Sequence, residues 1–143
     1  MSENRVLLVD DEKEFVSVLA ERLEARGLEV DTAESGETAL AKAQRRQFDA
    51  ILLDMAMPGM DGIQTLQGLL EINPDLQVIL LTGRATMKQA VEAMKLGALD
   101  LLEKPADIGT IVARIEEAAK KKSSLADKRI DDEMSDILRK KGW

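Results

Sequence analysis

Residues 50–62 read AILLDMAMPGMDG, and this stretch decides the fold. Its first four residues form a short, continuously apolar run, which is typical of a parallel strand buried on both faces of a sheet. Asp54 follows at the carboxyl end of the predicted strand, and Pro58 and Gly59 predict a turn soon after it. Ligands bind at this edge of open parallel sheets, so the position of Asp54 already indicates a functional site.

Four more short runs of strand character lie on either side of this stretch, and amphipathic segments separate them. The predicted strands are residues 6–9, 28–32, 49–53, 78–81 and 99–102. The predicted helices begin near residues 12, 36, 63, 86 and 108. This alternation predicts the α/β class, with a doubly wound, five-stranded parallel sheet, strand order 2-1-3-4-5 and a flavodoxin-like fold.

The sequence also predicts how two of these helices end and which side of the fourth is buried. Gly27 and Gly97 are expected to end the first and fourth helices in the left-handed conformation. Ala90, Val91 and Met94 recur at helical spacing in the fourth helix, so we expect them on its buried side.

The composition excludes several classes of function. The 143 residues carry a net charge of -7, which argues against direct nucleic-acid binding, because that affinity depends on clustered Lys and Arg. The chain has no Cys and no His, so disulfides, thiolate metal sites and the usual general base are absent, whereas oxygen-ligand chemistry remains. No apolar run approaches about 18 residues and the start lacks a signal peptide, so we expect a cytoplasmic protein without a membrane span.

A charge run followed by two serines, KKKSS at residues 120–124, comes after the five-helix pattern is complete. We therefore predict one domain over residues 1–122 and a C-terminal amphipathic helical extension or tail over 123–143. The tail carries apolar residues at helical spacing, namely Ile130, Met134, Ile137 and Leu138. A frayed, solvated tail fits the pattern equally well, because isolated helices of about 12–15 residues are marginal. A docking or dimerising helix that also uses Trp143 is a further hypothesis, and in the dimerising case the chain would be a homodimer.

Polar side chains follow four of the predicted strands. Asp10 and Asp11 come after the first strand, Asp54 after the third, Thr82 after the fourth, and Lys104 just past the fifth. The carboxyl ends of parallel strands share one edge, so these side chains are expected in one pocket. Carboxylates in close contact resist joint ionisation, so the group either binds protons with raised pKa values or binds a hard cation. Mg²⁺ prefers such oxygen ligands and also bridges phosphate oxygens.

Asp54 is the predicted nucleophile of this pocket. It stands alone after the most central apolar strand, and a loop rich in Gly and Pro follows it. A carboxylate can attack a phosphoryl donor and become an acyl phosphate while its neighbours hold the metal. Thr82 and Lys104 would then donate to the phosphoryl oxygens.

Each of these positions also has a plain structural interpretation. Asp11 with Glu14 three residues later could form a helix capping box without any metal. Asp54 before a Pro-Gly turn could be an Asx-turn residue. Four strand ends that furnish one coherent metal and oxyanion site favour the functional interpretation of the whole set.

Taken together, these segments resemble the receiver domain of bacterial two-component response regulators over residues 4 to about 119. The matching pieces are Val9-Asp10-Asp11-Glu12, the stretch from Leu53 to Gly62, Leu81-Thr82-Gly83, Gly97-Ala98-Leu99-Asp100, and Lys104-Pro105.

The resemblance implies a phosphorylation switch that catalyses only its own phosphorylation and dephosphorylation. It implies that Asp54 accepts a phosphoryl group from a sensor histidine kinase or a phosphotransfer protein, and that the downstream target is another protein. Mg²⁺ would be held by Asp10, Asp11, Asp54 and the backbone carbonyl of Ala56. Thr82 and Lys104 would contact the phosphoryl group.

Two further positions belong to this comparison. The family implies a cis peptide bond before Pro105, which proline permits at modest cost. Receiver domains commonly carry Tyr or Phe three residues before the Lys as the ring that reports phosphorylation, and this chain has Leu101 there. The chemistry at Asp54 does not need that ring, so the departure concerns only the readout.

Three other functions share parts of the pattern. A magnesium-dependent phosphatase of the aspartyl-phosphate type would carry a second Asp two residues after the first, where this chain has Ala56. A flavodoxin-like electron carrier would need a hydroxyl- and glycine-rich first loop, and this chain has Asp10 and Asp11 there. A degenerate receiver used only for binding is the third alternative, and the intact functional positions argue against it.

Overall fold

The computed structural model describes residues 4–55, 60–83 and 87–140, and within them five strands alternate with five helices. The elements are, in chain order, β1 Arg5–Val9, α1 Lys13–Ala25, β2 Glu29–Ala33, α2 Gly36–Arg45, β3 Ala50–Leu53, α3 Gly62–Ile72, β4 Val78–Thr82, α4 Met87–Leu96, β5 Asp100–Glu103 and α5 Ile108–Lys140. All neighbouring strands are parallel, and their order is β2-β1-β3-β4-β5. The predicted fold class and strand order are confirmed.

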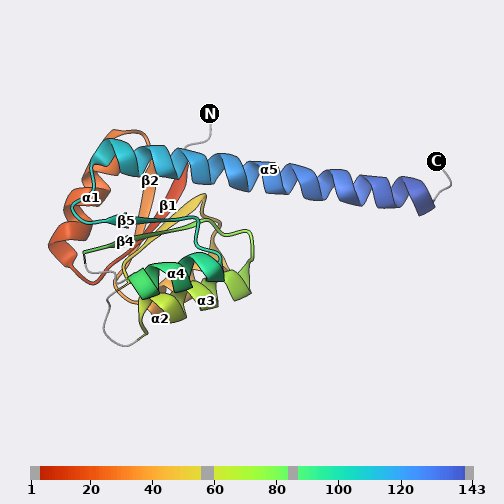
Figure 1. Cartoon of the computed structure of the whole chain (residues 1–143). Coiled ribbons are helices and arrows are strands. Elements are labelled where there is room, and N and C mark those ends of the chain that lie inside the picture. The colour runs from red at the N-terminus through yellow and green to blue at the C-terminus, as the bar shows by residue number, and fades with distance from the viewer. Residues whose placement is uncertain (1–3, 56–59, 84–86, 141–143) are drawn as a thin grey trace.

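Helices cover both faces of the sheet, with α1 and α5 on one side and α2, α3 and α4 on the other (Figure 1). Successive side chains of a strand point to opposite faces, so each buried strand must be apolar on both. In β1, Leu7 and Val9 pack into the core beneath α2 to α4, whereas Val6 and Leu8 pack into the core beneath α1 and α5. The two cores hold the strands in register and so fix where each strand ends.

The helix ends follow the local chemistry of the sequence. Gly27 and Gly97 have φ angles of 87° and 113°, so both predicted left-handed helix ends are confirmed. The Ser35 hydroxyl accepts a hydrogen bond from the backbone N–H of Thr38 and caps α2. Asp107 accepts from the backbone N–H of Thr110 in the same way at the start of α5. These caps place the loops at the two edges of the sheet.

The buried side predicted for α4 is wrong. Ala93 is the α4 residue that is fully buried, whereas Val91 and Met94 are each 45% exposed. The helix lies over the β4–β5 end of the sheet, where a small side chain suffices to contact the core. The larger residues line a shallow groove with Leu101 instead. Hydrophobic periodicity predicted that this segment is a helix, but it did not predict which of the apolar residues of α4 contact the sheet.

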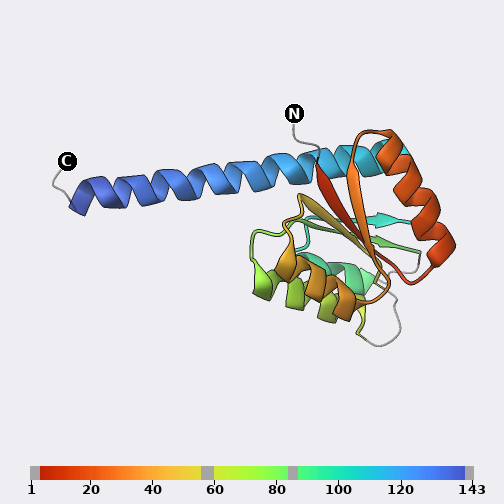
Figure 2. The same cartoon turned by 180° about the vertical axis from the view of Figure 1, so that it is seen from behind.

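α5 is a single helix of 33 residues that runs past the body of the domain (Figures 1 and 2). The helix crosses residues 120–124 without a break, because Lys and Ser lower helix stability only slightly and neither Gly nor Pro occurs there. The proposed division after residue 122 therefore falls within one helix and stays a prediction. No helix in the described ranges is long and apolar enough to cross a membrane.

Candidate functional site

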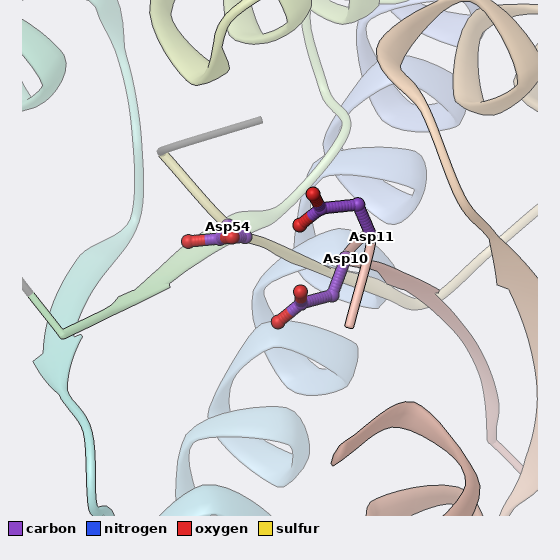
Figure 3. A group of neighbouring side chains, drawn as sticks. All are labelled: Asp10, Asp11 and Asp54. Atoms are coloured by element: carbon purple, nitrogen blue, oxygen red, sulfur yellow. The ribbon is translucent and has the colours of Figure 1, made fainter. Parts of the chain in front are cut away.

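Three aspartates converge at the carboxyl edge of the sheet. Asp10 and Asp11 follow β1, Asp54 follows the neighbouring β3, and each of the three offers a carboxylate oxygen within 4.8 Å of the other two (Figure 3). The backbone fixes two of them, since the N–H of Asp54 donates to the carbonyl of Val9 at 2.9 Å and the N–H of Asp10 donates to Ala33 at 3.1 Å. The topology thus produces the predicted cluster.

The cluster suits a hard cation. Asp10 and Asp54 are 2% and 5% exposed, so their carboxylates have little water to stabilise charge. Buried like charges are stable only with a cation nearby or with bound protons. Carboxylate oxygens without His or Cys neighbours are the donors that Mg²⁺ and Ca²⁺ prefer.

Lys104 supplies positive charge beside the cluster. Its ammonium donates to Oδ2 of Asp10 at 2.7 Å, while Oδ1 of Asp10 accepts the backbone N–H of Glu12 at 3.0 Å. Burial alone would lower the pKa of Lys104, but the hydrogen bond to Asp10 and the negative charges of Asp10, then of Asp54 and Glu12, outweigh it and raise this pKa above its ordinary value. Lys104 therefore stays protonated beside the carboxylates of Asp10 and Asp54.

Thr82 lies at the end of β4, next to Lys104. Its side chain is buried, and its backbone carbonyl accepts the N–H of Lys104 at 2.8 Å. This bond ties the ends of β4 and β5 together, so a hydroxyl and an ammonium come to the same edge as the aspartates. All the strand-end residues predicted for the pocket thus lie at one edge of the sheet, as expected from the sequence.

Phe15 is a neighbour of the site that the sequence did not reveal. Its ring lies under the ammonium of Lys104, with 4.2 Å between Nζ and the ring centroid. A cation over an aromatic face is attracted to it. Phe15 packs against the same core cluster as Leu19 and Leu23 of α1, but no spacing rule in the sequence pairs it with Lys104, which directly follows β5. Only the packing of α1 against the β5–α5 loop brings the two together.

The remaining predicted positions lie as follows. Leu101 is half-buried on β5 opposite Leu80. The peptide bond between Lys104 and Pro105 is cis, as the resemblance implied. Ala56 lies outside the described residues.

The capping-box interpretation of Asp11 finds no support. α1 begins after Glu12, and no side chain caps its first turn by a hydrogen bond. The carboxylate of Asp11 belongs to the acidic cluster instead.

Comparisons with known proteins agree with this geometry. The family model of the response regulator receiver domain matches residues 6–116. The transcriptional regulatory protein ZraR of Escherichia coli strain K12 is 39% identical over 113 residues, which are 79% of this chain and 26% of that protein. The acid tolerance regulatory protein ActR of Rhizobium meliloti is 38% identical over 110 residues, which are 77% of this chain and 57% of that protein. The chain thus spans from a quarter to a little over half of the length of these relatives.

Solved structures share the fold. A CheY-like response regulator receiver domain protein of Methanospirillum hungatei superposes with a TM-score of 0.82 at 28% identity, over 86% of this chain and 98% of that one. A Burkholderia pseudomallei response regulator with a phosphorylated aspartic acid, a calcium ion and citrate has a TM-score of 0.75 at 28% identity, over 98% of this chain and 86% of that one. The matched family model covers the acidic cluster and the five strands apart from Arg5, and the chain therefore belongs to the response regulator receiver domains of two-component signalling.

Proposed function

We propose that Asp54 is the phosphoacceptor of this receiver domain. Receiver domains are signalling switches rather than classical enzymes, and they interact with histidine kinases or phosphotransfer proteins. The observation that carries the proposal is a buried carboxylate with two other carboxylates and one ammonium around it. The phosphorylated aspartate in the Burkholderia pseudomallei regulator supports the same chemistry.

The transfer needs one bond to form and one to break. An oxygen of Asp54 attacks the phosphorus of a phosphohistidine, and the bond from phosphorus to the imidazole nitrogen breaks. The electron pair stays on the imidazole, and Asp54 becomes an acyl phosphate. The site excludes bulk water around this oxygen, because Asp54 is almost fully buried.

The residues that would hold Mg²⁺ are Asp10, Asp11 and Asp54, together with the backbone carbonyl of Ala56. When bound, Mg²⁺ supplies positive charge that offsets the negative charge of the carboxylates and of the incoming phosphoryl group. The calcium ion in the Burkholderia pseudomallei regulator is consistent with a hard cation in such a site.

Lys104 and Thr82 would respond to the new phosphoryl group. The group brings about -1.5 to -2 charges and three acceptor oxygens. The ammonium of Lys104, now bonded to Asp10, can pair with one oxygen, and the hydroxyl of Thr82 can donate to another. Since Thr82 and Lys104 are joined through their backbones, both would shift the β4 and β5 ends together.

The shift would alter partner binding at the protein surface. Leu101 lies on β5 beside the exposed Val91 and Met94 of α4, at the place where an aromatic ring reports phosphorylation in many receiver domains. An aliphatic side chain there has no ring to rotate, so its packing against α4 would carry the change. We propose that a histidine kinase or phosphotransfer protein in the cytoplasm is the donor and that the target is a protein rather than nucleic acid.

Labelling with acetyl phosphate tests the assignment. We expect the chain to gain the mass of one phosphoryl group in the presence of Mg²⁺, and the Asp54→Asn variant to gain none, as measured by intact-protein mass spectrometry. The control is Asp132→Asn, which makes the same chemical change on the exposed side of α5 and should label fully. Undiminished labelling of Asp54→Asn would sink the proposal.

A further inference from the structure

A cavity of about 420 Å³ lies at the edge of the sheet opposite the acidic cluster. One wall comes from the end of α2, the end of α3 and the loops that lead into β3 and β4, and α5 forms the other wall. The amino ends of the parallel strands share this edge, whereas the acidic cluster lies at their carboxyl ends. Cavities of this size hold small organic ligands.

Four cationic side chains line the cavity. Arg45 and Arg46 lie at the end of α2, and Lys122 and Arg129 come from α5. The two residues of α5 are seven positions apart, which is close to two full turns, so both project from the same side of the helix. Among the described residues that line the cavity, none is acidic. The lining is therefore basic in a chain whose net charge is -7.

The two cations of α5 also hold this helix to the body of the domain (Figures 1 and 2). Lys122 lies 3.6 Å from Asp49, and Arg129 pairs with Asp75. These pairs leave donors for a ligand, because a guanidinium has five N–H groups and an ammonium has three. The ion pairs thus place the cations of α5 at the cavity without using up their hydrogen bonds.

The cations at the end of α2 outnumber the carboxylates beside them. Arg46 lies 3.7 Å from Asp31, which has Lys42 as a nearer partner at 2.8 Å. Within the described ranges, no carboxylate pairs with Arg45. The C-terminal end of a helix carries about half a negative charge. Three cations therefore face one carboxylate and this half charge, and a positive excess remains.

Side-chain amides and apolar groups complete the lining of the cavity. Gln44, Gln47 and Asn73 offer N–H donors beside the cations. Phe48 and Leu76 also line the cavity and are almost fully buried, so they form its apolar floor. Charged donors next to apolar groups bind an anion more strongly than donors in open water, because fewer water molecules compete.

We propose that this cavity binds a small anion with a diphosphate group, which the two arginines at the end of α2 hold from one wall and the two cations of α5 hold from the other. Guanidinium groups bind phosphate oxygens through two parallel hydrogen bonds. Cations on two walls favour two joined phosphates over a single one, because each wall can then contact its own phosphate.

The proposed site is separate from the receiver chemistry. The family model ends at residue 116, so Lys122 and Arg129 lie outside the part of the chain that it matches. The described lining contains no residue of the acidic cluster, and the proposed binding therefore does not require phosphorylation of Asp54.

Isothermal titration calorimetry on the full chain tests the binding, with EDTA present so that no metal joins the acidic cluster to a phosphate. We expect inorganic pyrophosphate and adenosine diphosphate each to bind at one saturable site, and adenosine not to bind. Inorganic phosphate should bind about tenfold more weakly, because it engages one wall. Equal affinity for the two diphosphates identifies the bare diphosphate as the ligand, whereas tighter binding of adenosine diphosphate identifies a nucleotide. Absence of saturable binding by both diphosphates, or equal affinity for phosphate and pyrophosphate, overturns the proposal.

Matched variants locate the site. Arg45→Gln/Arg129→Gln should weaken pyrophosphate binding by about a hundredfold, because each wall loses one charged donor. The control Arg26→Gln/Arg139→Gln removes the same charge from exposed arginines that do not line the cavity, and it should bind like the wild type. Equal weakening in the two variants would mean general electrostatic attraction and would overturn the proposal. Circular dichroism checks that both variants keep their helix content.

Nuclear magnetic resonance on the unaltered chain gives a second measure that needs no variant. Adding pyrophosphate in EDTA should shift the amide signals of Gln47 and Asn73, which line the cavity. The amide signals of Asp11 and Thr82, at the carboxyl edge, should stay in place. Shifts at the carboxyl edge alone would put the anion at the acidic cluster and would overturn the proposed site.

Discussion

The acidic side chains at the carboxyl edge of the sheet have fewer cations beside them than the partly buried aspartates in the rest of the domain. Away from that edge, partly buried aspartates have cations of their own: Asp31 lies 2.8 Å from Lys42, and Asp49 lies 3.6 Å from Lys122. At the carboxyl edge, three carboxylates lie together, and among the described residues the ammonium of Lys104 is the cation that contacts them. Counted over the described residues, each of those two aspartates has a cation beside it, whereas the three carboxylates at the carboxyl edge share the ammonium of Lys104.

This difference separates structural acids from functional ones. A paired acid helps to hold two elements together, and its contribution is modest because each charge also loses water. A cluster with excess negative charge lowers the stability of the fold and gains stability from any cation that enters it. The excess at the carboxyl edge is therefore the feature that a metal ion and a phosphoryl group can exploit. Four predictions, from the largest expected effect to the smallest, sharpen or break this comparison.

Removing the ammonium should have the largest effect on stability. Lys104→Met keeps an unbranched side chain over Phe15 but leaves Asp10 buried without its partner, and we expect the free energy of unfolding to fall by about 2–3 kcal/mol. The measurement is urea unfolding in the presence of EDTA. The matched variant Lys42→Met, at a balanced pair with a more exposed acid, should lose only about 1 kcal/mol. Equal losses in the two variants would mean that the regions do not differ.

Adding Mg²⁺ should raise the free energy of unfolding, and this increase should depend on the acidic cluster alone. Mg²⁺ at ten times its dissociation constant should raise the free energy of unfolding by about 1.4 kcal/mol through mass action. Thermal unfolding with Mg²⁺ or EDTA measures this increment. Asp10→Asn should abolish the increment, whereas Asp49→Asn should retain it, because Asp49 lies at the other edge of the sheet. Retention by Asp10→Asn would argue against the cluster as the metal site.

The stability that the ion pair between Asp31 of β2 and Lys42 of α2 provides should depend on pH. Burial alone would raise the pKa of Asp31, but hydrogen bonds from Lys42 and from the N–H of Thr32, with the charges of Lys42 and Arg46, lower it. A carboxyl group with a lowered pKa in the folded state adds stability above its ordinary pKa, and this stability is lost as the pH falls through the lowered value. Asp31→Asn should therefore cost about 1 kcal/mol at neutral pH. The cost should shrink below about pH 4, as urea unfolding across pH would show. A cost independent of pH would contradict the ionic role of Asp31.

The sequence predicted the sheet and the acidic cluster well because both depend on short-range patterns. Continuously apolar runs identify buried parallel strands, and the topology brings their carboxyl ends together whatever the details of packing. Asp10, Asp11 and Asp54 could therefore be placed in one site before the structure was known. Gly27 and Gly97 were equally predictable, since the left-handed helix end favours glycine.

Features set by the packing of distant elements were not predictable. The apolar stripe of α4 gave no sign that Ala93 rather than Val91 or Met94 meets the core, because that depends on where the helix lies over the edge of the sheet. The continuity of α5 through residues 120–124 was also open, since the propensities of Lys and Ser differ from those of better helix formers by only tenths of a kcal/mol. The contact between Lys104 and Phe15 joins residues 89 positions apart and has no signature in the sequence.

That contact gives the smallest predicted effect and the finest test of the carboxyl edge. The ring of Phe15 adds attraction for the ammonium worth about 0.5–1 kcal/mol, and it helps to aim Lys104 at the carboxylates. Phe15→Leu keeps an apolar side chain against Leu19 but removes the ring, so we expect the rate of phosphorylation by acetyl phosphate to fall about two- to fivefold. Phe15→Tyr keeps the ring and should retain the wild-type rate. If both variants slow the reaction equally, Phe15 acts through packing alone, and the charge balance of the cluster depends on Asp10 and Lys104 without help from α1.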